Sequence, residues 1–564
     1  MLQIRLNTLL LLTILSMTTT TSAEESKPAP ETTSKPIISD QYRQGRSMAT
    51  SHHGMVAAST PAATLAGLDI LRAGGTAMDA AVAVATTLGV VEPMSIGTGG
   101  DAWMLYYEAK TGKVHALNGS GRSPQKLKRS HFKKDDKIDG WESVTVPGAV
   151  DAYWTGHQKF GKLPWADLFQ PAIRSAEEGY VVTEIVGTMW AAAAGKLSRD
   201  EWSKKSWLLP DSKAPKAGEI MKLPNLAQSL KTIAAGGRDA YYKGPIAEEI
   251  VRYAKETEGF LTMKDFEDHH SDWVDAISTN YRGYEVYQCP PNGQGAGVLM
   301  MLNILEGFDL PKMTFNSPEY LHLLIEAKKL AYADLYKFVG DPTRGKLPIE
   351  GLLSKDYAAE RRKLIDPAKA ASEVKPGIPK DGDTACFSVV DAEGNACSFI
   401  NSNFANFGSG ITGGSTGIIL QNRGEGFTLE KKHFNEYKPG TRPYHTIIPG
   451  MVTKDGKFYI TYGLMGGDMQ PQGHVQLLLA HLDHGFNIQQ AVDIPRWKHE
   501  KDQLIYLEEG NAPSTFDGIT ELGHEVKQAN FLTFGSAQVI RRDPNTGTLA
   551  GASDSRRDGL ALGY

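Results

Sequence analysis

Cysteine is scarce in this sequence. Among 564 residues there are three, Cys289, Cys386 and Cys397. Three thiols are too few for the disulfide framework on which small secreted domains depend. No spacing of cysteine and histidine matches a zinc site, so we expect no metal centre. The three cysteines are predicted to be free thiols in the core.

No block of basic residues is present either, and the formal net charge is −5. A surface that follows the backbone of a nucleic acid needs clustered lysine and arginine, so nucleic acid is not an expected partner. Beyond its N-terminus the sequence also lacks an apolar run long enough to span a membrane as a helix. The length is ample for a large core, which favours a large globular protein.

A short apolar run stands at the N-terminus. Arg5 precedes the apolar residues 9–17, and the small residues Thr21, Ser22 and Ala23 follow them. This is the arrangement of a secretory signal peptide, residues 1–23, so the mature protein is expected to be exported, either periplasmic or secreted. Residues 24–45 are rich in Ser, Thr, Pro and charge, and are predicted to form a disordered lead-in.

The remaining sequence alternates between helical and strand-like patterns. Residues 61–73 and 79–91 have helical spacing, and the second segment is apolar on all sides, as in a buried helix. After position 384 the pattern becomes richer in strands, with examples at 384–391 and 457–462. Two sheets with flanking helices give an α/β layered fold.

One junction in this pattern is sharper than the others. The polar residues 365–383 carry Pro, Lys, Asp and Gly, and an apolar, β-branched strand begins immediately afterwards at Thr384. A threonine that opens a strand is ordinary by itself, because β-branched residues favour strands. The polar segment before it is a natural place for a chain break.

The strand that begins at Thr384 is predicted to form a hairpin. A two-residue loop at 393–394 would pair Val390 with Cys397. Cys386 would then lie about four residue steps, or roughly 13 Å, from Cys397 along the ladder. That separation is too large for a disulfide.

Many blocks of the sequence resemble the γ-glutamyltranspeptidase (glutathione hydrolase) family of N-terminal-nucleophile hydrolases. The resemblance extends from Gly54 to Tyr564. In chain order the blocks are Gly54-Met55-Val56-Ala57, Asp69-Ile70-Leu71, Asp79-Ala80-Ala81-Val82-Ala83, Thr145-Val146-Pro147-Gly148, Tyr281-Arg282-Gly283-Tyr284, Ala331-Tyr332-Ala333-Asp334, Gly340-Asp341-Pro342, Phe387-Ser388-Val389-Val390-Asp391, Gly466-Gly467 and Gly551-Ala552-Ser553-Asp554.

The resemblance implies a four-layer αββα sandwich and a proenzyme that cuts itself between Asp383 and Thr384. The products would be a large subunit, 46–383, and a small subunit, 384–564, held together as a heterodimer. Thr384 would be the nucleophile, and its freed α-amino group would be the base. It would attack an amide carbonyl and pass the acyl group to water or to an amine. This chemistry needs no metal and no organic cofactor.

The resemblance also implies roles for residues around the nucleophile. Gly466 and Gly467 match the glycines of the oxyanion hole, where backbone N–H groups stabilise the tetrahedral intermediate. The second hydroxyl near the nucleophile falls on Ser402. In the family, an arginine and two serines hold the α-carboxylate of the glutamyl group, while Asn, Gln and Asp hold its α-ammonium group.

The substrate-binding positions depart from that pattern. The two serine positions are His445 and Thr446, and the Asn, Gln and Asp positions are Phe404, Arg423 and Gly426. A buried ammonium group would lack an acidic partner here and would lie near an arginine, which is unfavourable.

A carboxylate fits this environment better. Arg122 lies about two places from the position of the family's arginine, on a loop that follows two glycines. We predict that Arg122 and Arg423 together hold a carboxylate, because guanidinium groups bind carboxylates in a bidentate manner.

Three functions remain open from the sequence. The family default is cleavage of γ-glutamyl compounds such as glutathione. The substitutions also resemble a branch that includes an oxamate amidohydrolase, so the alternative is an amidohydrolase for a small acidic amide. A non-catalytic binding protein of the envelope is the third, although such a protein would not need Thr384, Gly466 and Gly467.

Overall fold

The computed structural model describes residues 44–133, 136–374 and 383–564, and for residues 383–385 it describes the backbone alone. The expected signal peptide and almost all of the expected lead-in lie outside the described residues. Among the described helices, none combines the length and the apolar character that a membrane span requires.

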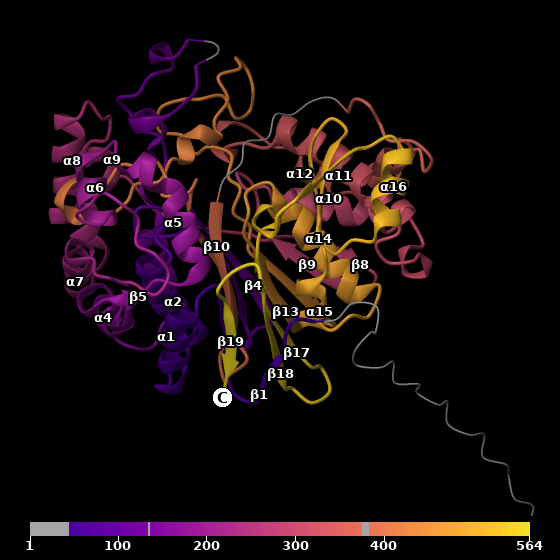
Figure 1. Ribbon diagram of the computed structural model, residues 1–564, viewed down its shortest axis with the longest axis horizontal. Coiled ribbons are helices and arrows are strands. Elements are labelled where there is room, and N and C mark those ends of the chain that lie inside the picture. Colours follow the sequence, from indigo (N-terminus) through magenta and orange to yellow (C-terminus); the bar gives the residue numbers. More distant parts are fainter. Residues whose placement is uncertain (1–43, 134–135, 375–382) are drawn as a thin grey trace, which may run out of the picture. The chain divides into compact units, whose positions relative to one another are not determined.

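Two seven-stranded sheets form the centre of the fold (Figure 1). In the first sheet every neighbouring pair of strands is antiparallel. Its strands, in spatial order, are β19 (Leu560–Gly563), β2 (Met55–Ala58), β10 (Asp383–Val390), β11 (Ala396–Phe404), β3 (Asp101–Glu108), β4 (Lys113–Gly119) and β7 (Asp272–Val274). The strand that begins at the predicted cleavage junction, β10, therefore lies inside a sheet and has a neighbour on each side.

The second sheet is also antiparallel throughout. Its strands, in spatial order, are β1 (Ala49–Ser51), β18 (Leu549–Ser553), β17 (Ala537–Arg542), β13 (Lys457–Leu464), β12 (Gly450–Lys454), β9 (Tyr284–Gln288) and β8 (Ile277–Tyr281). Apolar side chains of both sheets form one core, in which Trp103, Cys386 and Ile400 of the first sheet join Met451 and Ile540 of the second. The sheets therefore pack face to face.

Helices cover the outer face of each sheet. The apolar helix α2 packs against β10 and β11, and α10 packs against β8 and β9. The helices of the first layer include α1 (Pro61–Arg72), α2 (Ala77–Val91), α3 (Ala149–Phe160), α4 (Gln170–Glu178) and α7 (Pro224–Tyr242). Those of the second are α10 (Gly295–Leu305), α11 (Pro318–Phe338), α14 (Met469–Leu482) and α15 (Ile488–Asp493). The order helix, sheet, sheet, helix confirms the expected αββα sandwich.

The described chain contains further α-helices and strands. The helices are α5 (Glu184–Leu197), α6 (Glu201–Trp207), α8 (Pro245–Glu256), α9 (Met263–Glu267), α12 (Ile349–Leu352), α13 (Lys355–Arg362) and α16 (Pro513–Glu521). The strands are β5 (Tyr180–Val181), β6 (Ile220–Met221), β14 (Trp497–Lys501), β15 (Leu504–Glu508) and β16 (Glu525–Ala529).

Both sheets contain strands from each side of position 383. In the first sheet β10 and β11 lie between β2 and β3, and in the second β12 pairs with β9. The two parts of the sequence therefore share one core. A cut after Asp383 would leave them bound to each other through both sheets.

The predicted hairpin exists, but its register differs from the prediction by one residue. Cys397 pairs with Val389 rather than with Val390, because the loop is longer than two residues. The carboxylate of Asp391 accepts hydrogen bonds from the backbone N–H groups of Glu393 and Asn395, and Gly394 adopts a φ of 87°. The prediction that all three cysteines are free and buried is confirmed.

Candidate active site

The backbone of Thr384 lies at an irregularity of the first sheet. Asp383 pairs with Phe404 and Ala385 pairs with Asn401, so two residues of β11, Ser402 and Asn403, lie opposite Thr384 alone. Such a bulge changes the direction in which side chains leave a strand and is frequent next to active sites. It brings the predicted second hydroxyl residue, Ser402, to the same level of the sheet as Thr384. The Ser402 side chain is buried, and its Oγ accepts a hydrogen bond from the Phe404 N–H at 2.9 Å.

The predicted oxyanion-hole glycines lie between β13 and the first turn of α14. Gly466 has a φ of 118° and Gly467 a φ of 56°, values that favour glycine. Their carbonyl groups accept the N–H groups of Met469 and Gln470, which start the helix. The N-terminal end of a helix carries partial positive charge, so a loop at this point suits a negatively charged oxygen.

A buried glutamine joins this loop to the predicted substrate-binding segment. The Gln294 amide donates to the carbonyl oxygens of Gly467, at 2.9 Å, and of Thr446, at 2.5 Å. The hydroxyl of Tyr444 donates to the Gln294 Oε1 at 3.0 Å. The glycine loop and the segment that contains His445 and Thr446 are therefore held next to each other.

Arg423 is completely buried beside that segment. Its Nη1 donates to the Thr446 hydroxyl at 2.9 Å, and its guanidinium lies 4.4 Å from the centre of the Phe404 ring. Within the described part of the chain, the Nε and Nη2 atoms of Arg423 have no hydrogen-bond partner. Burial lowers the pKa of Arg423 to about 9, so the group remains charged at neutral pH. Buried N–H groups of a cation are costly when unpaired, which indicates a place for an anionic ligand.

His445 is the neutral neighbour of this arginine. Burial, reinforced by the charge of Arg423, lowers the pKa of His445 to about 3. The Ile447 N–H donates to its Nδ1 at 3.4 Å, so Nε2 carries the proton and donates it to Asp101 Oδ2 at 3.1 Å. His445 is thus a hydrogen-bond donor to Asp101 and carries no charge at neutral pH.

Asp101 supplies the negative charge of the site, and the sequence interpretation did not include it. Its Oδ1 accepts the N–H groups of Gly121 and Gly148, at 2.9 and 3.1 Å, and the Gln421 amide at 2.8 Å. Burial by itself raises its pKa, but the hydrogen bond from His445 and the nearby Arg423 hold it below the ordinary value. The signal was present as an acid directly after a glycine-rich loop, at the start of a strand.

Two further positions define the space around Arg423. Phe404 has a φ of 78°, which is rare outside glycine and is a conformation that accumulates at functional sites. At Gly426 a Cβ atom would lie 2.5 Å from the carbonyl oxygen of Tyr444. The position at which the family has an acid therefore has no room for a side chain unless the backbone moves.

The backbone of Arg122 lies next to the site, but its side chain contacts an acid other than Asp101. Its carbonyl oxygen accepts the Val146 N–H, and its Nη2 lies 3.7 Å from Asp272. Asp272 also forms an ion pair with Arg442, whose Nη1 lies 2.6 Å from Oδ2. The joint binding of a carboxylate by Arg122 and Arg423 stays a prediction.

A separate cluster, His322, Glu326 and His524, is compact enough to be considered as a metal site. Its donor atoms are used by protein groups, however. His322 donates to the carbonyl of Asp366 at 2.8 Å and contacts His524 at 2.9 Å, while Glu326 accepts the Lys329 ammonium group at 2.7 Å. That ammonium group would repel a cation. The cluster is therefore best explained as a structural one, which holds the segment that begins at Asp366 through hydrogen bonds.

The architecture and this site define the class of the protein. Two antiparallel sheets between helical layers, with an inner strand that begins at the Asp383–Thr384 junction, form the sandwich of an N-terminal-nucleophile hydrolase. Residues 63–564 match the family model Gamma-glutamyltranspeptidase, and the chain belongs to this family of hydrolytic enzymes.

Proteins similar to this chain are named for different hydrolytic activities. The chain is 38% identical over 516 residues to the glutathione hydrolase-like YwrD proenzyme of Bacillus subtilis, covering 89% of this chain and 96% of the relative. It is 31% identical to the oxamate amidohydrolase proenzyme of Klebsiella pneumoniae, and the match covers 91% of this chain and 99% of the relative. The fold is similar to the crystal structure of cephalosporin acylase from Bacillus halodurans, with a TM-score of 0.88 and 38% sequence identity. The match covers 96% of this chain and 99% of that structure.

Proposed function

We propose that the chain is a self-processing amide hydrolase and acyltransferase with Thr384 as its nucleophile, and that its acyl donor carries a carboxylate bound by Arg423. Cleavage between Asp383 and Thr384 yields a large subunit, 46–383, and a small subunit, 384–564, which remain together as a heterodimer. Removal of residues 1–23 precedes this, and the mature enzyme acts in the periplasm or outside the cell.

The chemistry needs an activated hydroxyl and a site for a negative oxygen. The α-amino group that cleavage frees on Thr384 has an ordinary pKa of about 7.7–8.0, which suits it to accept the hydroxyl proton. The N–H groups of Gly466 and Gly467 stabilise the tetrahedral oxyanion. Collapse of this intermediate transfers the proton held by the α-amino group to the leaving amine, which departs and leaves an acyl group on the threonine oxygen. Water or an acceptor amine then attacks this acyl group.

The observation that supports the donor class is the unpaired face of Arg423. Its Nε and Nη2 atoms form an edge that matches a carboxylate, while Thr446 and Phe404 fix the rest of the guanidinium. A small acidic amide of the oxamate type presents a carboxylate close to its scissile amide. The carboxylate would neutralise a buried charge that has no other partner on that edge.

γ-Glutamyl compounds such as glutathione are the second candidate, favoured by the 38% identity to a glutathione hydrolase-like proenzyme. Their α-ammonium group would lie near the Arg423 guanidinium, and Gly426 offers no acid to receive it. We therefore place the small acidic amide first.

A comparison of donors tests this order. Purified, processed enzyme is given oxamate and related monoamides of short diacids in one set of reactions, and a γ-glutamyl anilide in another. We expect a higher kcat/KM for the diacid monoamides. Preferred turnover of the anilide would overturn the assignment of the donor but not of the enzyme class. A chain that stays uncut, with no new N-terminus at Thr384, would overturn the class of mechanism.

A further inference from the structure

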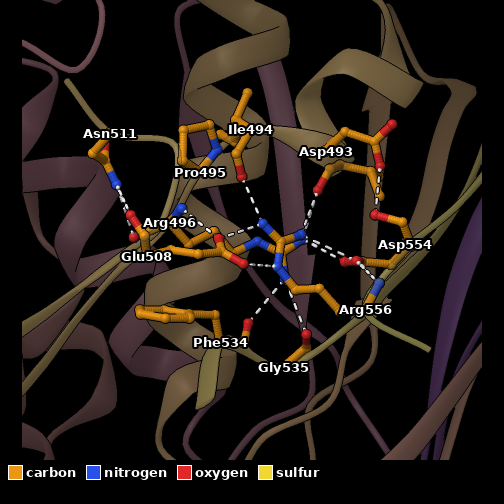
Figure 2. A network of polar contacts seen from close by, with 12 residues as sticks. Asp493, Ile494, Pro495, Arg496, Glu508, Asn511, Phe534, Gly535, Asp554 and Arg556 are labelled. Carbon is orange, nitrogen blue, oxygen red and sulfur yellow. Dashed lines mark hydrogen bonds and ion pairs between the residues drawn. The ribbon is translucent and has the colours of Figure 1, made fainter. Parts of the chain in front are cut away.

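A buried group of four charged side chains is formed by Arg496, which follows α15, Glu508 at the end of β15, and Asp554 and Arg556, which follow β18 (Figure 2). Arg496 and Arg556 both bind Asp554: Arg496 Nη2 lies 2.6 Å from Oδ2, and Arg556 Nη1 lies 3.0 Å from Oδ1. Arg556 also binds Glu508 through its Nε at 2.7 Å, and the Arg496 backbone N–H donates to the same acid at 2.9 Å. Each of the four is less than 9% exposed. The network is fully formed from protein groups.

The two arginines differ in what else they hold. Arg556 donates to the carbonyl groups of Val492 and Ile494, at the end of α15. Arg496 shares the Val492 carbonyl, through Nη2 at 2.9 Å, but its Nη1 donates to the carbonyl groups of Phe534, at 2.9 Å, and Gly535, at 3.4 Å (Figure 2). Of the two arginines, Arg496 is therefore the one that donates hydrogen bonds to the turn that precedes β17.

That turn packs directly against the oxyanion loop. Gly535 has a φ of 67°, and a Cβ atom there would lie 2.0 Å from the carbonyl oxygen of Met465. From the other side, a Cβ atom on Gly466 would lie 3.1 Å from the Gly535 Cα. The two glycine backbones are in contact, so a movement of one displaces the other.

The same turn also reaches the nucleophile strand. The carbonyl oxygen of Ser536 accepts the Met465 N–H at 3.0 Å and the Cys386 thiol at 3.5 Å. The next residue, Ala537, donates its N–H to Asp554 Oδ2 at 2.8 Å. One short segment, 534–537, is thus tied to the charged network, to the oxyanion loop and to β10.

We infer that Arg496 is a positioning residue for self-cleavage and catalysis, acting through the 534–537 segment on Gly466 and on the strand that begins at Thr384. This rests on the proposed function, in which Thr384 and Gly466 carry the chemistry. The planar guanidinium holds Asp554 and the carbonyl groups of Val492, Phe534 and Gly535 at once, which a lysine ammonium on a flexible stem does not reproduce. Arg496 touches neither substrate nor reacting atoms.

The test compares Arg496→Lys with its matched control, Arg556→Lys, which alters a second buried arginine on the same carboxylate. Purified precursors are incubated well below the lower Tm, and the small subunit with Thr384 at its N-terminus is quantified over time. For the processed enzymes, kcat and KM are measured with whichever amide the wild type hydrolyses fastest.

We expect Arg496→Lys to lower the rate of self-cleavage and kcat by about 100-fold, the order of effect that a misplacement of about 1 Å produces. Its KM should change less than about threefold, because Arg423 is untouched.

The control separates positioning from stability. Arg556→Lys should lose a similar amount of Tm but keep its self-cleavage rate and kcat within about tenfold of wild type, since it does not contact the 534–537 segment. Equal losses of kcat in the two variants, or an unchanged kcat in Arg496→Lys, would overturn the positioning role. An uncut wild-type chain would instead overturn the proposed function, and this inference with it.

A second variant serves if Arg496→Lys does not fold. Gly535→Ala disturbs the same contact from its other side and leaves the charged network intact. We expect it to slow self-cleavage and to lower kcat without a matching rise in KM. Normal self-cleavage and normal kcat in a folded Gly535→Ala protein would contradict the route through Gly535.

Discussion

Thr384 and Arg423 illustrate how differently two residues can depend on their surroundings. The position of Thr384 at a change from polar to apolar sequence was visible along the chain. The position of Arg423 became meaningful only when Asp101, Phe404 and Thr446 were found around it. The protein contacts the Arg423 guanidinium at Nη1 and over its face, while Nε and Nη2 have no hydrogen-bond partner among the described residues.

The first prediction concerns the proposed nucleophile. Thr384→Ala should remain one uncut chain and should lose hydrolysis by at least about 1,000-fold, because alanine offers no oxygen for either reaction. Denaturing gel electrophoresis with N-terminal sequencing of the small fragment checks the first part. A Thr384→Ala protein that is still cut after Asp383 would contradict self-cleavage.

The second prediction concerns the donor carboxylate. Arg423→Gln should raise KM for the acidic amide by about 10- to 100-fold, since hydrogen bonds to charged groups contribute about 1.5–3 kcal/mol. Arg122→Gln is the comparison, and we expect a smaller rise because Arg122 already contacts Asp272. Equal KM values for wild type and Arg423→Gln would remove Arg423 from the donor site.

At the scale of elements, the connection between β13 and α14 determines the geometry of the predicted oxyanion loop. A strand must turn into a helix within four residues, and two consecutive glycines with positive φ make this possible. The turn before β17 packs on the first of these glycines, Gly466. Neither element can shift without the other.

The third prediction tests this loop. Gly466→Ala should lower kcat by about 100-fold or more, as removal of an oxyanion donor does in other hydrolases, because its positive φ and its contact with Gly535 force the loop to move. Gly456→Ala is the matched control, a glycine with a φ of 73° in the turn that precedes the same strand, with open space around its Cα. It should lose stability and keep kcat.

Part of the element-scale prediction was wrong for a physical reason. The strands on either side of position 393 were expected from their composition, and they exist. Their register could not be derived, because the Asp391 carboxylate organises a longer loop by accepting backbone N–H groups. A change of loop length by one residue changes every cross-strand pair.

At the scale of the whole molecule, the two predicted subunits share both sheets and one inner core. Separation of the subunits would expose the edges of β2, β3 and β9 together with the apolar layer between the sheets. The association is therefore part of the fold rather than a contact between finished domains.

The fourth prediction follows from this shared core. After complete self-cleavage the two fragments should elute together in size-exclusion chromatography and should separate only in denaturant, because each lacks strands that the other supplies. Elution of a free small subunit under native conditions would contradict the shared fold.

The fifth prediction concerns acid stability. Burial lowers the pKa of His445 and of His474 to about 3, from an ordinary value of 6.5. Between these values the unfolded chain binds protons that the folded chain does not, so stability is full above pH 6.5 and falls as the pH drops towards 3. Each histidine contributes up to about 1.4 kcal/mol per pH unit in this window.

Urea unfolding of the uncut Thr384→Ala chain at several pH values measures this slope. His474 contacts Tyr462 and Gln288, away from Arg423, so His474→Gln provides the comparison. It should have a shallower loss of stability between pH 6.5 and 4. An unchanged slope would show that His474 is protonated in the folded state.

The sequence by itself determined the layered fold and the free cysteines and predicts the junction at Thr384, because these follow from periodicity, composition and recurring local blocks. The tertiary structure alone brought Asp101 to His445 and Arg423, left no space at Gly426, and placed Arg496 behind the turn that packs on Gly466. Periodicity reports which face of an element is buried, but it does not report which distant element covers that face. The predicted binding site is assembled from such distant pairs. For that reason, its chemistry could be derived only from the tertiary structure.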